Sequence, residues 1–320
     1  MRIVPLARHA GQTPFAASQM AKAASMRLMR AHPITLRADK FSMTDTKNLT
    51  QKMQNAELEA LASTPKLSNK GFVPWATWES ENSSFGRTFR DWAGYPSFLP
   101  IFVCSDHGVN IHEKVGLNEY NNKYKIFLTW NVYKYNILRT KSEFSPIYVQ
   151  HPWINYRNKN YPRRTENLAK EKKGTLVFFP HSNPSSILEI DYDSFYKELA
   201  ALPNKFQPVS VCLMSHDINK GLHKRLFSYG FPIVTAGNTN SRFFVDRFYK
   251  MISAYRYAAT VDIGSHVFYC LEAGMPVFLI DQKFRRTAVE DWGEFKSGDR
   301  IKIENLNKKE KVRIARFKKK

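Results

Sequence analysis

Short apolar runs alternate strictly with amphipathic segments between residues 174 and 281, and this rhythm constrains the fold more than any other feature of the chain. The apolar runs predict buried strands over 174–180, 208–214, 231–236, 257–261 and 276–280. The segments between them predict helices over 193–202, 221–229, 241–256 and 265–273. Strands separated by helices of about ten residues cannot form hairpins, so the pattern predicts crossover connections and a parallel sheet.

Polar residues follow these strands, at the edge of the sheet where ligands bind in open α/β proteins. They are His181, Ser182, Ser215, His216, Gly237, Asn238, Gly264, Ser265 and His266. A polar rim on an apolar scaffold predicts a ligand-binding unit.

A second, shorter α/β unit is predicted before this one. Ser84 can cap a helix that places Phe85, Phe89 and Trp92 on one apolar face and ends at Gly94. Strands are predicted over 100–104, 125–129 and 146–149. The fold class expected is therefore α/β, with two Rossmann-like units of which the first is short or atypical.

The sequence also predicts where these units begin and end. We expect an atypical N-terminal extension, partly helical (over 44–62), then an N-terminal α/β unit, a basic linker, a C-terminal Rossmann-like unit and a basic tail. Their boundaries are 1–71, 72–160, 161–173, 174–282 and 283–320.

The net charge of +21 predicts an anionic partner, which is nucleic acid, an anionic membrane face or a phosphorylated substrate. Residues 305–320 are strongly basic and fit either a basic interfacial helix or a solvated tail. No apolar run is long enough to span a bilayer, and the first forty residues lack the apolar core of a secretory signal. We therefore expect a cytoplasmic protein, with peripheral attachment at the inner membrane as a further expectation.

The cysteines and acidic residues give no sign of a metal site. Cys104, Cys212 and Cys270 each lie in or beside an apolar run and lack metal-binding spacing, which predicts buried free thiols in a reducing compartment. Asp191 and Asp193 have the spacing of a DxD metal motif but precede a predicted helix, where Asp193 is a natural N-cap. We expect no metal.

The segment from Gly264 to Glu272 has the chemistry of an anion site. Gly264, Ser265 and His266 at a helix start offer backbone N–H groups, a helix dipole and side-chain donors to a diphosphate. Glu272 lies two helical turns after Ser265 on the same side, where a carboxylate can bind two ribose hydroxyls. The alternative is that Ser265 is only an N-cap and Glu272 only a solvated helix residue.

Several segments together carry a family resemblance. They are 174–182, 215–217, 221–223, 234–237 and above all 263–276, Ile-Gly-Ser-His-Val-Phe-Tyr-Cys-Leu-Glu-Ala-Gly-Met-Pro. They resemble the carboxy-terminal half of GT-B-type glycosyltransferases of lipopolysaccharide and capsular polysaccharide biosynthesis, and of the related sugar-nucleotide 2-epimerases. The resemblance covers roughly the last two-thirds of the chain.

The resemblance implies two Rossmann-like units facing a cleft and a nucleotide-sugar as substrate, with no cofactor. It implies metal-independent transfer of a hexosyl or sialyl group to a cell-envelope polysaccharide or lipid-linked acceptor. The residues implied in donor binding are His181, Ser182, Ser215, His216, Gly237, Gly264, Ser265, His266 and Glu272.

An inverting transfer needs a base that deprotonates the acceptor hydroxyl, and Asp106 or His107, after a predicted strand, could serve. This segment loosely resembles the acidic pair and glycine of bacterial sialyltransferases, with histidine in place of the second acid. The alternative is a tight turn in which Asp106 bonds to its own backbone.

Three other functions remain open from the sequence. A sugar-nucleotide 2-epimerase would form product without an acceptor, and a non-catalytic relative would explain the short first unit. A nucleic-acid-binding protein would explain the net charge, but the basic runs lie in the linker and the tail and not on one patterned element.

Overall fold

The structure is a computed structural model, and its description covers most of the chain between residues 55 and 288. The residues described are 55–63, 82–95, 101, 103–109, 125–161, 163, 171–182, 186–239, 241 and 243–288. The chain forms two compact units. Among the described residues, the first unit contains 82–161 and 239–246, and the second contains 55–63, 163–238 and 247–288.

The second unit is built on a five-stranded parallel sheet in the order β7-β6-β4-β8-β9. Its strands are β4 (Lys173–Phe178), β6 (Val209–Cys212), β7 (Ile233–Val234), β8 (Tyr255–Thr260) and β9 (Val277–Leu279). All four neighbouring pairs run parallel. The predicted α/β class with a parallel sheet is therefore confirmed, and each predicted strand overlaps an observed one.

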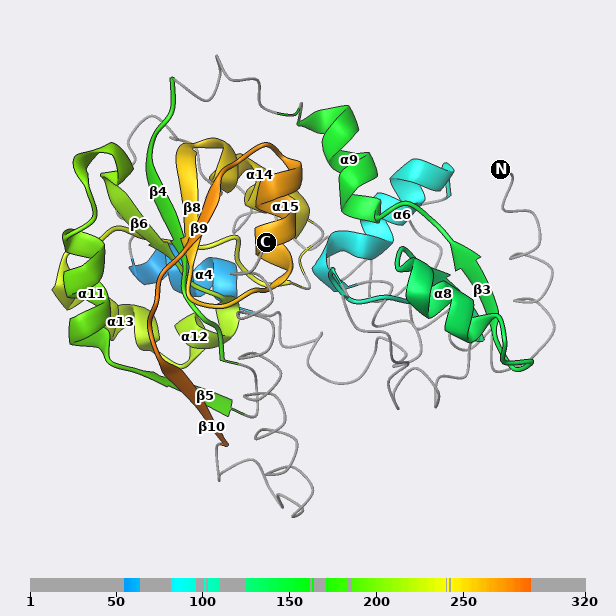
Figure 1. Ribbon diagram of the computed structural model, residues 1–320, viewed down its shortest axis with the longest axis horizontal. Helices are drawn as coiled ribbons and strands as arrows, with labels where there is room; N and C mark the ends of the chain where they lie inside the picture. Colours follow the sequence, from blue (N-terminus) through cyan, green and yellow to red (C-terminus); the bar gives the residue numbers. More distant parts are fainter. Residues whose placement is uncertain are drawn as a thin grey trace. The chain divides into compact units, whose positions relative to one another are not determined.

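Helices cover both faces of this sheet, as Figure 1 shows for α11 and α13 on one side and α14 and α15 on the other. The helices of this unit are α4 (Asn55–Ala62), α11 (Tyr192–Ala200), α12 (Ser215–Asn219), α13 (Leu222–Leu226), α14 (Phe244–Ser253) and α15 (Ser265–Glu272). The first residues of α14, up to Asp246, belong to the first unit. Asp191, and not Asp193, is the N-cap of α11, because its carboxylate accepts a hydrogen bond from the Ser194 N–H over 3.0 Å.

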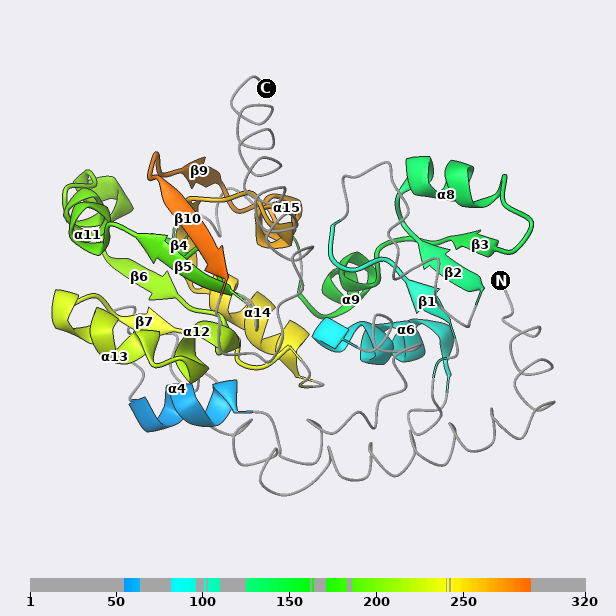
Figure 2. The same cartoon turned by 90° about the horizontal axis from the view of Figure 1, so that it is seen from below.

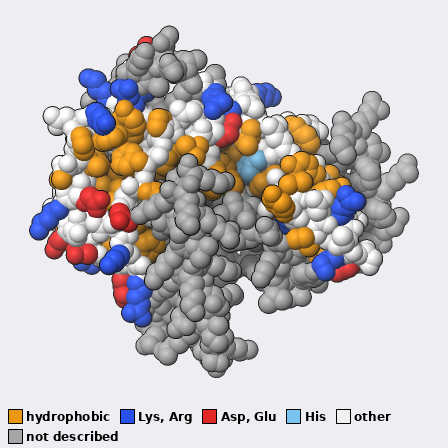
Figure 3. All heavy atoms as spheres, in the orientation of Figure 1, with side chains coloured by type: hydrophobic (Ala, Val, Ile, Leu, Met, Phe, Trp, Pro, Cys, Tyr) orange, Lys and Arg blue, Asp and Glu red, His pale blue; other side chains and the backbone are white. Residues whose placement is uncertain are grey.

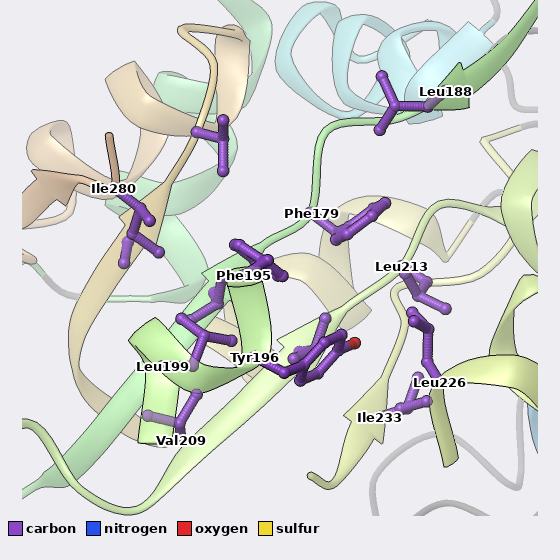
Figure 4. Close-up of a cluster of buried hydrophobic side chains, with 14 of the residues drawn as sticks. Phe179, Leu188, Phe195, Tyr196, Leu199, Val209, Leu213, Leu226, Ile233 and Ile280 are labelled. Carbon is purple, nitrogen blue, oxygen red and sulfur yellow. The ribbon is translucent and has the colours of Figure 1, made fainter. Parts of the chain in front are cut away.

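The apolar core of the second unit lies between α11, α13 and the sheet (Figure 4). Phe195 and Leu199 on α11 are fully buried against strand residues such as Val209. Tyr196 stacks on Tyr229 with ring centroids 4.3 Å apart. Burial of these large side chains is the main term that stabilises the unit, at about 1.5–3 kcal/mol for each.

A separate antiparallel pair joins β5 (Ser186–Ile190) to β10 (Phe284–Ala288). The sequence analysis predicted neither strand and placed the start of a basic tail at residue 283. The structure instead gives residues 284–288 regular strand pairing, and the tail predicted beyond them lies outside the described residues.

Helix α4 belongs to the core of the second unit, although it precedes all the described residues of the first unit in the chain. Leu58, Leu61 and Ala62 are buried, and Figure 2 shows the helix beside α12. The Asn238 N–H donates to the Leu61 carbonyl over 2.9 Å, and the Asn238 side chain donates to the Ala62 carbonyl over 3.1 Å. The predicted N-terminal extension therefore contains a helix that the second unit needs.

The first unit contains a three-stranded parallel sheet in the order β1-β2-β3. Its elements are η1 (Asn82–Ser84), α6 (Phe85–Ala93), β1 (Cys104–Ser105), β2 (Ile126–Thr129), α8 (Val132–Leu138), β3 (Ser145–Tyr148) and α9 (Pro152–Asn160). Helix α8 and helix α9 were not predicted. Asn131 caps α8 by accepting the N–H groups of Tyr133 and Lys134.

Aromatic rings pack around Phe85 in the first unit. Its ring centroid lies 5.5 Å from Trp130, 5.6 Å from His151 and 6.1 Å from Trp153, with edge-to-face geometry. Phe89 is buried beside them, but Trp92 is 49% exposed. The predicted apolar face of this helix is therefore confirmed for its first two members and wrong for the third.

Ser84 caps a different helix from the one predicted. It makes no side-chain cap to α6; its hydroxyl instead accepts the Val245 N–H over 3.1 Å, in the first turn of α14, and donates to the Ser241 carbonyl. Asp246 in the same turn bonds to Arg87 and to the Tyr156 hydroxyl. These contacts fix the start of α14 within the first unit.

Helix α9 ends at Asn160, directly before the predicted basic linker 161–173. His151 caps this helix by accepting the Trp153 N–H over 3.1 Å, and Pro152 occupies its first turn, where a missing N–H has no cost. Arg157 is buried in the last turn of α9. All three cysteines are free and buried, as predicted.

Among the helices that the structure describes, none is both long and apolar enough to cross a membrane. On the face drawn in Figure 3, the Lys and Arg side chains of the described residues lie in several small groups. The basic tail, to which the sequence analysis assigned the membrane contact, lies outside the described residues.

We predict that Leu58→Ala destabilises the second unit by about 2–5 kcal/mol, because Leu58 is fully buried and its truncation leaves a cavity. Thermal and urea denaturation of the full chain measure the effect. The exposed Asn55 at the start of the same helix supplies the control, Asn55→Ala, for which we expect little change. Equal stability of the two variants would contradict the place of α4 in the core.

Candidate functional site

The strand order of the second unit reverses at β4, and this defines where a ligand site is expected. Strand β4 pairs with β6, the next strand of the sheet along the chain, on one side, and with β8 on the other. Loops that leave these neighbouring strands diverge at the reversal, and ligands of open α/β sheets bind in the resulting crevice at the carboxyl ends. His181 and Ser182 follow β4, and Gly264, Ser265 and His266 follow β8.

Ser182 is buried in a hydrogen-bond network with α12. Its backbone N–H and its hydroxyl both donate to Asp217 Oδ1, over 3.1 and 2.6 Å. Lys220 Nζ donates to the Ser182 hydroxyl over 3.2 Å. Burial lowers the pKa of Lys220, an effect that the carboxylate of Asp217 opposes. The network therefore fixes the loop after β4 and places an ammonium group beside it.

His266 is held rigidly at the start of α15. Its ring packs on Phe178 with centroids 4.6 Å apart, and its Nε2 lies 3.0 Å from the hydroxyl of Thr260. Burial lowers the pKa of His266 to about 4, with Asp262 opposing and His181 adding to the effect. A Cβ atom at Gly264 would lie 2.9 Å from His266 Nδ1, so the glycine is required for this ring position.

His181 connects the two sides of the reversal electrostatically. It is exposed at the end of β4, and its charge would act on both His266 and His216. Burial lowers the pKa of His216, and both His181 and Lys220 add to the effect while Asp217 opposes it. Three imidazoles and one ammonium thus gather at the ends of β4, β6 and β8, and we call these residues (His181, His216, Lys220 and His266) the basic cluster.

Helix α15 places the other predicted donor-binding residues. Gly264 is its N-cap and offers no side-chain cap, while the Val267 N–H in the first turn donates to the Gly264 carbonyl over 3.2 Å. The hydroxyl of Ser265 bonds to the phenol of Tyr269. Glu272 is the last residue of the helix, so Ser265 and Glu272 lie at opposite ends of the helix on one side of it.

Gly237 lies apart from the basic cluster, and Ser215 directly precedes His216 at the start of α12. Gly237 lies under α4, where an added Cβ would be 2.8 Å from the Leu61 carbonyl oxygen. Its N–H donates to the Thr235 hydroxyl over 2.9 Å. Ser215 is buried at the start of α12. The donor-binding roles of both residues stay predictions, and the reversal at β4 brings together His181, Ser182, His216, Gly264, Ser265 and His266.

Asp106 and His107 follow β1 in the first unit and have different environments. Asp106 is fully buried, with its Oδ1 2.7 Å from Lys134 Nζ and its Oδ2 accepting from the Thr129 hydroxyl over 2.5 Å. Trp130 donates its indole N–H to the Gly108 carbonyl, which closes the turn. His107 is exposed. The buried ion pair gives Asp106 a structural role, and the catalytic assignments stay predictions.

The sequence analysis did not include Asp217 or Lys220 among the site residues. It assigned 215–217 to a strand end, whereas the structure forms the short helix α12 there. This helix turns Asp217 toward Ser182. The signal in the sequence was the spacing of Asp217 and Lys220 after a predicted strand, because residues three positions apart lie on one face of a helix.

Within the part of the chain that the structure describes, no three His, Cys, Asp or Glu side chains form a group that could hold a metal ion. Comparison with protein-family models, curated proteins and solved structures gave no match to this chain.

We predict that the free protein loses stability as the pH falls from about 7 to about 5. The pKa of His151 is lowered by burial to about 3, so between that value and 6.5 the unfolded chain binds a proton that the folded chain does not. The loss begins below the unfolded pKa and amounts to roughly 2 kcal/mol at pH 5 for this residue. Thermal denaturation as a function of pH measures it.

The matched variant is His151→Asn, because asparagine keeps an N-cap acceptor for α9 and does not titrate. We expect its melting temperature to fall less over the same pH interval. A parallel fall in the variant and the wild type would contradict the assignment.

We predict that Asp106→Asn destabilises the protein by roughly 3–5 kcal/mol, because it removes the carboxylate charge 2.7 Å from the buried Lys134 ammonium. Asp91, on α6, supplies the control, Asp91→Asn, because its side chain is 49% exposed and its ion pair with Arg87 is long. If Asp106→Asn unfolds like the wild type in thermal denaturation, the structural role is wrong.

Proposed function

We propose that the second unit binds a nucleotide-sugar at the carboxyl edge of its sheet, and that the protein is a glycosyltransferase. The observation that carries the proposal is the basic cluster at the point where the strand order reverses. Ligands in this class of sheet bind there, and imidazole, ammonium and helix N–H groups are donors for phosphate oxygens. The family resemblance of residues 263–276 supports a nucleotide-sugar as the ligand.

The diphosphate would bind between Lys220 and the N-terminus of α15, next to His266. Glycosyl transfer breaks the bond between the sugar and the diphosphate, and negative charge develops on the leaving oxygen. Fixed donors stabilise that charge without a metal ion. Glu272, at the far end of α15, would accept hydrogen bonds from the ribose hydroxyls, as the resemblance implies.

We extend the proposal to a GT-B-like, two-unit transferase in which the first unit serves the acceptor. The acceptor hydroxyl must lose its proton to a base within hydrogen-bond reach. His107 is exposed, whereas the carboxylate of Asp106 is fully buried and pairs with Lys134. His107 is therefore the base that we propose of the two residues.

The acceptor that we propose is a cell-envelope polysaccharide or a lipid-linked saccharide, reached from the cytoplasm. The net charge of +21 supports attraction to an anionic membrane face. The sequence of 305–320 supports the same contact through its lysines and arginines.

We predict that one of UDP, GDP and CMP, or one of their sugar conjugates, raises the melting temperature of the protein. A ligand at a hundredfold excess over its dissociation constant stabilises the folded state by about 2.7 kcal/mol. Lys220→Gln and Glu272→Ala should reduce the shift, because each removes a proposed contact. Lys197→Gln is the matched control, since Lys197 is an exposed lysine of α11 outside the basic cluster.

A shift that survives both site variants would place the nucleotide elsewhere. No shift with any nucleotide in a cooperatively melting protein would contradict the proposed function. Turnover then separates the enzyme classes, because a transferase releases nucleotide only when an acceptor is present and a 2-epimerase needs none.

A further inference from the structure

The hydrogen bond of His181 fixes which ring nitrogen carries its proton. His181 Nδ1 lies 2.9 Å from the backbone carbonyl oxygen of Ser182. A carbonyl oxygen only accepts, so Nδ1 must carry the hydrogen. In the neutral ring Nε2 is then a lone-pair acceptor, and none of the described residues bonds to it.

His266 is fixed in the opposite tautomer by Thr260. The Thr260 hydroxyl has one hydrogen, and its shortest bond to a pure acceptor is to the Asp262 carbonyl, at 2.8 Å. The 3.0 Å contact with His266 Nε2 therefore requires that the ring nitrogen donate. His266 Nδ1 is the lone-pair nitrogen of the neutral ring, and it faces Gly264 at the start of α15.

Both rings thus offer lone pairs at the place where a phosphate would bind. The oxygens of a nucleotide-sugar diphosphate are also acceptors, so a neutral ring and such a phosphate repel each other at these nitrogens. A proton on the ring converts the lone pair into a charged donor, and charge-assisted bonds to phosphate are about twice as strong as neutral ones.

We propose that the second unit binds its phosphate-bearing ligand together with a proton, taken from solvent onto His181 Nε2 or His266 Nδ1. This inference rests on the proposed function and adds the protonation state in which the site accepts its ligand. The complex then contains one proton more than the separated partners, and the affinity falls as the pH rises.

The charged groups around the two rings come from four elements. Asp262 follows β8, His216 and Asp217 belong to α12 with Lys220 as its C-cap, and the charge of His181, after β4, acts on His266 in α15. Lys220 and His216 oppose protonation of their neighbours, and the carboxylates of Asp217 and Asp262 favour it. In the free protein burial also lowers the pKa of His266, so the negative charge of a bound anion would favour its protonation.

Isothermal titration from about pH 6 to about pH 8.5 tests the proposal, with UDP, GDP, CMP and inorganic sulfate as probes. Sulfate does not titrate in this interval, so any pH dependence of its binding comes from the protein. The dissociation constant should rise with pH, by up to about tenfold for each pH unit, over the interval in which the ring is neutral in the free protein and protonated in the complex. Titrations in two buffers of different ionisation enthalpy should show uptake of about one proton.

Two variants of His181 make the test specific. Glutamine places an amide N–H near the position of Nε2 at every pH, so His181→Gln should bind more weakly than the wild type at low pH and at least as well at high pH. Asparagine places its amide near Nδ1 and keeps only the bond to Ser182, so His181→Asn should bind more weakly throughout. Lys197→Gln again serves as the control.

The outcomes separate this inference from the proposed function. Nucleotide binding with a flat pH profile and no proton uptake would overturn the inference and leave the function standing. Sulfate binding with proton uptake, but no nucleotide binding, would keep the inference and remove the function. Binding of no probe would remove both.

The tautomers have their own readout in the nitrogen-15 spectrum of the imidazole rings. We expect hydrogen on Nδ1 of His181 and on Nε2 of His266 in the free protein near pH 8. The reverse assignment at both rings would overturn the inference even if the protein folds and binds a nucleotide.

Discussion

Strand β4 pairs in parallel with β6 on one side and with β8 on the other, and the rest of the candidate site depends on these two pairings. They bury the apolar residues of β4 on both faces, with Leu176 and Val177 fully inaccessible. They also bring His181 and His266 to one edge, although 85 residues separate them in the chain. The strand order therefore places the polar side chains of the candidate site together, at one edge of a sheet whose interior is apolar.

The hydrogen bonds at this edge serve two purposes at once. The bonds from Ser182 to Asp217 and from His266 to Thr260 hold the loops after β4 and β8 in place. The same bonds decide which ring atoms remain for a ligand, because His181 and His266 each have one nitrogen engaged in a hydrogen bond with a described residue. The scaffold holds the side chains of such a site in place before the ligand binds. Protonation of an imidazole still changes a lone-pair nitrogen into a hydrogen-bond donor.

The parallel sheet could be predicted from the sequence because its strands are short apolar runs separated by helices with a regular period. The helix that starts at Ser265 was also predictable, since a glycine and a serine precede an apolar repeat. The antiparallel pair β5–β10 was missed because its strands are 94 residues apart, from Ile190 to Phe284, and no local sequence pattern pairs them. Likewise, α4 has an ordinary amphipathic pattern, and only the fold shows that Leu58 completes the second core. Lys220 was missed because α12 has only five residues, Ser215–Asn219, so the spacing of Asp217 and Lys220 was the weak signal that the sequence offered for it.

Hydrogen exchange of the full chain, with and without the nucleotide that stabilises it most, tests the central claim most directly. The account predicts that the ligand slows exchange in the three loops at the reversal, over 179–182, 213–220 and 260–267, while 235–238 under α4 changes little. Protection confined to other segments, with these three loops unchanged, would contradict the claim that the carboxyl edge around β4 is the ligand site.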